Sequence, residues 1–391
     1  MTNKRKATTS ASNAGGPAKK TRAARASTLE VIPSNKLSWT KCATAEGVKD
    51  TSINDLTTLN SGSRVTDAQF LTFRVIWPGR KGMEALKIPN EEKADEIIEA
   101  MNPWWQRYIK HMKDGKLTSP SIQLGTFQTV RSNQQKVENA LPKASSESES
   151  QSTTSETPAE TDSRSTSPSQ LRQRTPAADS FDPEKQWIKT KDEQIVNDAI
   201  ISYLDVLTLN IPGLGSLCSS ERLRLLFEFK AAQMEARTGG FLGIRGKDES
   251  KEAFATIEAK AAIRQRSNHH HGVYKEESAQ TVLLIAQDSK NGRFTTLPRL
   301  QSAHKHQRLP RSQDRHEIFI VIASYDDDYV RYLKKEDPQT PSFMVMQEYG
   351  PFIIGEYTNM QYLAQFIVGF CLEVNERISM ACPKVIIDNH P

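Results

Sequence analysis

A low-complexity segment between residues 144 and 180 sets the strongest limit on how this chain can fold. It consists mainly of Ser, Thr, Glu, Gln and Pro, as in the run Ser145-Ser146-Glu147-Ser148-Glu149-Ser150. This composition offers too little apolar surface to offset the conformational entropy that folding removes. We therefore expect a disordered linker at 144–180, with one folding unit on each side of it.

The bulk composition limits the class of protein. The chain has 391 residues, of which 37% are hydrophobic and 25% are charged, enough for one or two cores of ordinary size. No apolar run reaches the roughly 18 to 20 residues that a membrane span requires, so we expect a soluble intracellular protein with no membrane partner. The four cysteines show no Cys-x-x-Cys pair and no zinc-finger spacing, which predicts reduced thiols. The composition leaves the oligomeric state open.

The first 34 residues form a basic tail without hydrophobic periodicity. Its two basic clusters consist of Lys4, Arg5 and Lys6 and of Lys19, Lys20 and Arg22. This layout is typical of a bipartite nuclear import signal, because an extended tail can place two clusters in two acidic pockets of an import receptor. The sequence thus predicts a disordered tail, an import receptor as partner and a location in the nucleus. Contact with nucleic-acid phosphates is the alternative role for such a tail.

Residues 35–143 have a mixed composition that predicts a small separate α+β region of unknown role. The apolar run over 70–77 favours a strand. A helix is expected over 91–112, with Asn90 as its N-cap and with a kink or break at Pro103, which lacks a backbone N–H.

The region 181–391 alternates between helical and strand patterns. Apolar residues recur at helical spacing over 192–207, whereas apolar and polar residues alternate over 223–230. Further strands are expected over 234–242, 317–324 and 343–346, and a closing helix over 359–375. Helices and strands mixed in this order predict an α/β sandwich.

The pair Glu258 and Lys260 is the strongest candidate for chemistry. Helix propensity alone predicts a helix over 251–266, which is rich in Ala, Glu and Lys. In a strand, however, residues two apart project from the same face, so Glu258 and Lys260 would lie side by side. The carboxylate could then hold a divalent metal, and the ammonium group could stabilise charge on an attacked phosphate. Glu-x-Lys alone is a weak signal, because it occurs in most proteins.

The order of three motifs along the chain strengthens the prediction of a site at Glu258 and Lys260. They are Arg237-Thr238-Gly239-Gly240, then Ile257-Glu258-Ala259-Lys260 followed by Arg264, then Glu277-Ser278-Ala279-Gln280. In this order and spacing they resemble the PD-(D/E)XK nuclease-like domain that is found in many fungal proteins. The resemblance covers roughly the last 200 residues and assigns 181–391 to that domain. It implies a restriction-endonuclease-like mixed sheet flanked by helices, preceded by the small separate region and the disordered segments.

The resemblance also implies roles for individual residues. Glu258 would be a ligand of Mg²⁺ (or Mn²⁺), and Lys260 would be the catalytic lysine. Glu277 and Gln280 would be helix residues near the active centre, with Glu277 as a further metal ligand. Arg264 would contact nucleic acid.

One position departs from the family pattern. Gly239 stands where the family has an aspartate, and glycine has no side chain that could bind a cation. A second carboxylate would have to come from Glu277 or from the first helix, for example from Glu193. Two functions follow from this. The first is a metal-dependent phosphodiesterase, a nuclease acting on DNA or RNA in the nucleus. The second is a non-catalytic nuclear protein, a nucleic-acid-binding protein or an adaptor, that retains the fold.

The region 293–315 is strongly basic. We expect a surface loop there, in which Arg308 and Arg311 would contact the phosphates of nucleic acid if the domain binds it. A solvated loop without a ligand is the alternative interpretation.

Two further clusters have a structural and a metal-binding interpretation. The run His269-His270-His271 favours a solvated loop, because three adjacent loop residues cannot all face one ion without strain. The run Asp326-Asp327-Asp328 favours the N-cap of a helix over 329–333, and a magnesium site is the alternative.

Overall fold

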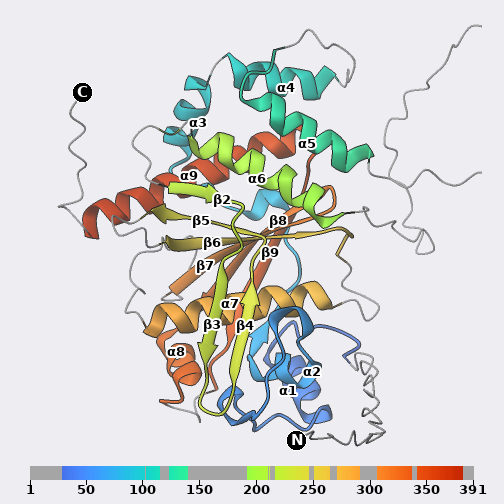
Figure 1. Ribbon diagram of the computed structural model, residues 1–391, viewed down its shortest axis with the longest axis vertical. Helices are drawn as coiled ribbons and strands as arrows, with labels where there is room; N and C mark the ends of the chain where they lie inside the picture. Colours follow the sequence, from blue (N-terminus) through green and yellow to red (C-terminus); the bar gives the residue numbers. More distant parts are fainter. Residues whose placement is uncertain are drawn as a thin grey trace, which may run out of the picture.

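A mixed seven-stranded sheet with helices on both faces forms the centre of the described part of the chain (Figure 1). This computed structural model describes residues 29–101, 103–114, 123–139, 192–209, 211, 216–245, 251–264, 271–290, 306–336 and 341–381. The α/β class and the mixed, helix-flanked sheet are thereby confirmed. The basic clusters of the expected import signal and the expected linker at 144–180 lie outside the described residues.

The strands follow the order β1-β9-β8-β7-β6-β5-β2 across the sheet. Their bounds are β1 (Val75–Ile76), β2 (Ser216–Ser219), β5 (Gly240–Arg245), β6 (Lys251–Lys260), β7 (His306–Asp314), β8 (Glu317–Tyr325) and β9 (Met344–Ile353). The pairs β1–β9 and β6–β7 are parallel, and the remaining neighbours are antiparallel. A separate antiparallel hairpin consists of β3 (Arg224–Glu228) and β4 (Gln233–Arg237). The carboxyl ends of β6 and β7 therefore lie at the same edge of the sheet.

Two layers of helices cover the sheet (Figure 1). On one side lie α3 (Glu91–Ala100), α4 (Trp104–Asp114), α5 (Phe127–Asn139), α6 (Glu193–Leu209) and α9 (Tyr357–Ala381). On the other side lie α1 (Lys36–Ala45), α2 (Asp67–Thr72), α7 (Gly272–Lys290) and α8 (Asp327–Lys334). The described residues also form the short 3₁₀ helices η1 (Ile53–Asp55), η2 (Gly62–Arg64) and η3 (Met83–Ala85). Each layer encloses one cluster of buried apolar side chains against the sheet.

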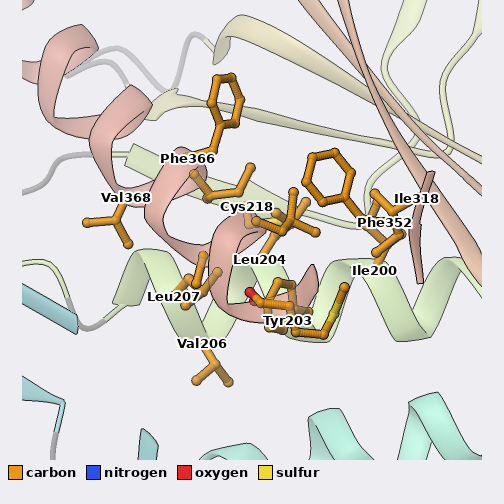
Figure 2. Close-up of a cluster of buried hydrophobic side chains, with 14 of the residues drawn as sticks. Ile200, Tyr203, Leu204, Val206, Leu207, Cys218, Ile318, Phe352, Phe366 and Val368 are labelled. Carbon is orange, nitrogen blue, oxygen red and sulfur yellow. The ribbon is translucent and has the colours of Figure 1, made fainter. Parts of the chain in front are cut away.

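The apolar core beneath α6 and α9 holds α6 in place, and the start of α6 forms one wall of the site described below. Figure 2 shows side chains of α6, among them Leu204 and Leu207, beside Phe366 of α9 and Phe352 of β9. The hydroxyl of Tyr203 donates a hydrogen bond of 2.5 Å to the carbonyl oxygen of Met360. The expected helix over 192–207 is confirmed as α6, which forms because its apolar residues recur at helical spacing.

The N-terminal region is not the separate unit that its composition suggests. Strand β1 pairs with β9, which extends the main sheet by one strand. The indole N–H of Trp77 donates to the hydroxyl oxygen of Ser278 on α7 at 3.0 Å. The hydroxyl of Tyr332 on α8 donates to the carbonyl oxygen of Thr72 at 2.6 Å. Residues on both sides of the segment 144–180 therefore share one core, a long-range arrangement that local composition cannot reveal.

Most of the expected local elements are confirmed. The single strand expected over 234–242 is wrong, because the segment forms the end of the β3–β4 hairpin and then strand β5 of the main sheet. The helix expected over 91–112 is interrupted at Pro103 and forms α3 and α4. The backbone N–H of Tyr329 donates to Asp326 Oδ1 at 2.8 Å, which confirms the N-cap of α8. The strand expected over 70–77 is wrong for its first half, because 67–72 form α2. Asn90 caps α3 without a side-chain hydrogen bond. Among the described helices, none combines the length and the apolar character needed to cross a membrane.

Candidate functional site

A cleft of about 430 Å³ opens at the carboxyl end of β6. Its walls come from η2, from the start of α6, from β4 and the residues that follow it, and from the start of α7. Glu258 and Lys260 of β6 lie at its base, together with Glu276 of α7 and Glu193 of α6. Segments far apart in the sequence thus bring several charged groups to one edge of the sheet.

Strand pairing places Glu258 and Lys260 side by side. Lys251–Lys260 pairs with β5 on one side and with β7 on the other, so hydrogen bonds to two neighbours override its helix propensity. Ile257 and Ala259 alternate with the two charged residues and are buried in the core. The strand interpretation of this segment is therefore confirmed.

The carboxylate of Glu258 is held by two donors. Its Oε1 accepts a hydrogen bond of 2.7 Å from Lys260 Nζ, and its Oε2 accepts one of 2.7 Å from Gln280 Nε2. Gln280 Nε2 also donates to the carbonyl oxygen of Arg237 at 3.0 Å, which fixes the amide against β4. Burial raises the pKa of Glu258, and the charge of Lys260 opposes this shift. The structure thus brings together three of the predicted site residues and fixes the orientation of Glu258.

Lys260 lies among three carboxylates. Its Nζ is 2.7 Å from Glu258 Oε1, 3.0 Å from Glu276 Oε2 and 3.9 Å from Glu193 Oε1. Burial alone would lower the pKa of Lys260, but the charges of Glu258 and Glu276 outweigh burial and raise it above its usual value. The nearest oxygens of Glu258 and Glu276 lie no more than 5.7 Å apart, the sum of their two distances to Nζ. Carboxylate oxygens therefore surround one cationic position.

The structure places Glu277 away from this cleft. Its side chain is 1% exposed, and its Oε1 lies 2.5 Å from Arg264 Nη2 beneath α7. Adjacent helical residues point about 100° apart, so the neighbouring Glu276 faces the cleft instead. The expected role of Glu277 as a metal ligand beside Glu258 therefore does not fit the structure. The sequence analysis did not identify Glu276. The signal that could have identified it is its i, i+4 spacing from Gln280, which places both residues on one helix face.

Gly239 occupies a crowded position beside Glu258. Its N–H donates to the carbonyl oxygen of Ile257 at 2.9 Å, and its own carbonyl oxygen accepts from Asn197 Nδ2 at 3.1 Å. A Cβ atom on Gly239 would lie 3.2 Å from both Asn197 Oδ1 and the oxygen of Ile257. Asn197 Oδ1 is buried and has no hydrogen-bond partner within the described residues. The position at which the sequence resemblance led us to expect an aspartate is thus bordered by two oxygen atoms.

The three arginines expected to contact nucleic acid are buried. Arg264, Arg308 and Arg311 are 4%, 3% and 1% exposed. Arg308 and Arg311 belong to the central strand β7, so the expected surface loop is wrong for 306–314. Arg308 Nη2 pairs with Asp288 Oδ2 at 2.6 Å. Because phosphate contacts require accessible guanidinium groups, the expectation for these three residues does not fit the structure.

Arg311 is a charged group in an apolar layer. Its guanidinium carbon lies 5.4 Å from the ring centre of Phe370, and its three side-chain nitrogens have no hydrogen-bond partner within the described residues. Burial lowers the pKa of Arg311 to about 10 from 12.5. A base with a lowered folded-state pKa costs stability at every pH below that pKa, and the cost is relieved as the pH rises above it. At pH 7 this cost is about 3 kcal/mol.

We expect Arg311→Leu to raise the free energy of unfolding by about 2 to 3 kcal/mol at pH 7, because it removes an unpaired buried charge. The measurement is urea unfolding followed by circular dichroism. Arg308→Leu is the matched control and should lower stability, because it removes the buried ion pair with Asp288. An Arg311→Leu protein less stable than the wild type would contradict the prediction.

The solvated loop expected at His269, His270 and His271 is wrong for His271, which is the one residue of the three that the structure describes. His271 is 1% exposed, and its imidazole Nε2 lies 3.2 Å from the carbonyl oxygen of Glu30. Asp326 caps α8, as expected. Among the residues with a described placement, no three His, Cys, Asp or Glu side chains are already arranged to hold a metal ion.

No protein-family model matches this chain, and no curated protein matches it. The chemistry of the cleft is therefore the guide to its function. The convergence of carboxylate oxygens beside an ammonium group is suited to binding cations and to stabilising charge on a phosphate.

Proposed function

We propose that the cleft is the active site of a metal-dependent phosphodiesterase, a nuclease that hydrolyses nucleic acid. The observation that carries the proposal is the pair of Glu258 and Lys260, held by Gln280 at the base of an accessible cleft. Buried ion pairs seldom stabilise a fold more than apolar residues of the same size do. Charged groups that are kept in a cleft with shifted pKa values therefore indicate a functional requirement.

The side chains at the cleft fit a hard divalent cation in their chemistry. Glu258, Glu276 and Glu193 supply carboxylate oxygens around one cationic position, and Mg²⁺ and Mn²⁺ prefer oxygen ligands. These three residues would hold the ion, and Gln280 would keep Glu258 in orientation. When bound, the ion would polarise a phosphate and lower the pKa of a water molecule. These carboxylates support the proposal, with Glu276 as the metal ligand in place of Glu277.

Basic side chains at the cleft support a phosphate as substrate. Lys260 remains protonated at neutral pH and can stabilise the additional negative charge that forms on the attacked phosphate. Arg222 and Arg237 line the same cleft and are exposed. The tail with Lys4, Arg5 and Lys6 supports the further proposal that the substrate is met in the nucleus.

A second candidate is a non-catalytic nuclear protein that binds nucleic acid or acts as an adaptor. Gly239 favours it, because the residue offers no carboxylate at the second position of the family pattern. The ammonium group of Lys260 also favours it, since it already occupies the position around which the carboxylates gather.

Metal binding separates these two candidates. We expect calorimetry to detect Mn²⁺ or Mg²⁺ binding by the wild type in the micromolar to millimolar range, and no binding by Glu258→Gln. The full chain must be used, because residues such as Trp77 belong to the same core as α7. Glu235→Gln is the control, since Glu235 lines the cleft but pairs with Arg224 and Arg237. If the wild type binds neither ion, the second candidate replaces the first. If it binds an ion, cleavage of single-stranded and double-stranded DNA and RNA is the next assay.

A further inference from the structure

A second pocket, of about 600 Å³, lies at the turn of the β3–β4 hairpin. It is formed where this turn meets the ends of α7 and α8. Figure 1 shows the hairpin running from the sheet past α7 toward α8. Four lysines line the pocket, namely Lys230, Lys290, Lys334 and Lys335, together with the aromatic ring of Phe227.

The four lysines outnumber the carboxylate that lines the same pocket, Glu228, and give it an excess of positive charge. Lys335 lies 3.4 Å from Asp55, and Lys334 lies 3.9 Å from Glu336. Within the part of the chain that the structure describes, Lys230 and Lys290 form no ion pair. Contact with Lys335 lowers the pKa of Lys230, because two ammonium groups side by side repel each other. The helix dipoles favour lysines at the ends of α7 and α8, but they do not explain Lys230, which lies in the hairpin turn. A bound anion would relieve this repulsion.

The aromatic ring adds a second kind of contact. Phe227 is half-buried, and its ring lies 4.9 Å from that of Phe229 in an edge-on arrangement. Phe229 is buried in the core and therefore holds Phe227 in position. A fixed aromatic face beside several lysines is the combination that binds unpaired bases and their phosphates.

We infer that this pocket binds one nucleotide of a single-stranded nucleic acid, with the base against Phe227 and a phosphate against Lys230 and Lys335. The inference rests on the proposed nuclease function and adds a binding site for the substrate away from the reacting phosphate. Phe227 pairs with Met234 on β4, and Thr238 at the cleft lies four residues further on. At about 3.4 Å per residue this separation is roughly 14 Å. It corresponds to about four stacked nucleotides.

Fluorescence anisotropy with labelled twelve-nucleotide DNA and RNA strands tests the inference. Binding is measured in EDTA, so it does not depend on catalysis. The double variant Lys230→Glu/Lys335→Glu should bind at least tenfold more weakly and show a smaller salt dependence, because phosphate contacts release counterions. Phe227→Leu keeps an apolar side chain but removes the stacking face, and should weaken binding by about tenfold. Circular dichroism of each variant verifies that the fold is intact.

The control is Lys87→Glu/Lys110→Glu, which makes the same charge change at exposed positions outside the hairpin. It should bind like the wild type. The inference is overturned if the hairpin variants and the control bind equally, if no strand binds to the wild type, or if a phosphorylated peptide binds in place of the oligonucleotides. Cleavage in Mn²⁺ is measured separately. Binding that depends on the pocket without cleavage would refute the nuclease function alone, whereas cleavage without pocket dependence would refute this inference alone.

Discussion

Arg264→Met is expected to lower the free energy of unfolding by about 3 to 5 kcal/mol, enough to unfold a large fraction of the protein under mild heating. Arg264 joins three carboxylates from three elements. It lies 2.5 Å from Asp314 Oδ2 on β7, 2.5 Å from Glu277 Oε1 on α7 and 3.1 Å from Glu348 Oε1 on β9. Removing the guanidinium group would leave these buried negative charges to repel one another. The measurement is urea unfolding at pH 7.

The pH dependence of the stability of Arg264→Met tests whether repulsion among the buried carboxylates causes the loss. Burial raises the pKa of Glu277 to about 7 from 4.5, and Arg264 opposes that shift. A carboxyl group with a raised folded-state pKa stabilises the fold below its unfolded pKa, and this contribution is lost as the pH rises through the folded value. Without Arg264 the pKa of Glu277 rises further, so protonation of Glu277 removes more of the repulsion among the buried carboxylates. The destabilisation by Arg264→Met should therefore be smaller at pH 5 than at pH 8.

Two variants serve as controls for the Arg264 prediction. Arg237→Met removes an exposed arginine that pairs with Glu235 and should change stability by less than about 1 kcal/mol. Adding Glu277→Gln to Arg264→Met should restore part of the lost stability, because it removes one of the repelling charges. A destabilisation that does not vary with pH, together with no rescue, would show that Arg264 acts only by filling space.

Local patterns predicted the elements whose stability comes from a single amphipathic face. Helix α6 and strand β3 were predicted because their apolar residues recur at regular spacing. Strand β7 was not predicted because both of its faces carry buried polar residues, such as Gln313 and Arg308, and Arg308 pairs with Asp288 of α7. The polar pattern of this strand looks like that of a surface loop. Its position is set by pairing with β6 and β8, which no local pattern contains.

The candidate site was also predictable only in part, because local patterns do not contain the long-range contacts that complete it. Glu258, Lys260 and Gln280 were identified through the order of short motifs, and the structure brings them within hydrogen-bonding distance. The choice between Glu276 and Glu277 depends on the rotation of α7 about its axis, and the Arg264 cluster on the sheet side of the helix fixes that rotation. The sequence alone does not show where this cluster forms.

Gly239→Asp is expected to strengthen Mn²⁺ binding by about 10- to 100-fold, because it adds a second carboxylate beside Glu258 and the oxygen of Asn197. The φ angle of Gly239 lies outside the left-handed region, so the backbone conformation allows a side chain. A Cβ would lie 3.2 Å from Asn197 Oδ1 and from the carbonyl oxygen of Ile257, so these neighbours must shift by a few tenths of an ångström. Without metal, the new carboxylate would face the oxygens of Asn197 and Ile257. We therefore expect the variant to be less stable than the wild type in EDTA and to gain stability when Mn²⁺ is added.

Gly239→Asn is the matched control, because asparagine has the same size as aspartate and lacks its charge. It should show the same steric cost in EDTA and little gain in metal affinity. If Gly239→Asp binds Mn²⁺ and cleaves nucleic acid while the wild type does neither, the natural protein retains the arrangement of a nuclease without its activity. If both proteins cleave, Glu276 or Glu193 already supplies the second carboxylate. Equal metal affinity of the aspartate and asparagine variants would contradict the placement of a metal site beside Glu258, because an added carboxylate within reach of a bound cation must stabilise it.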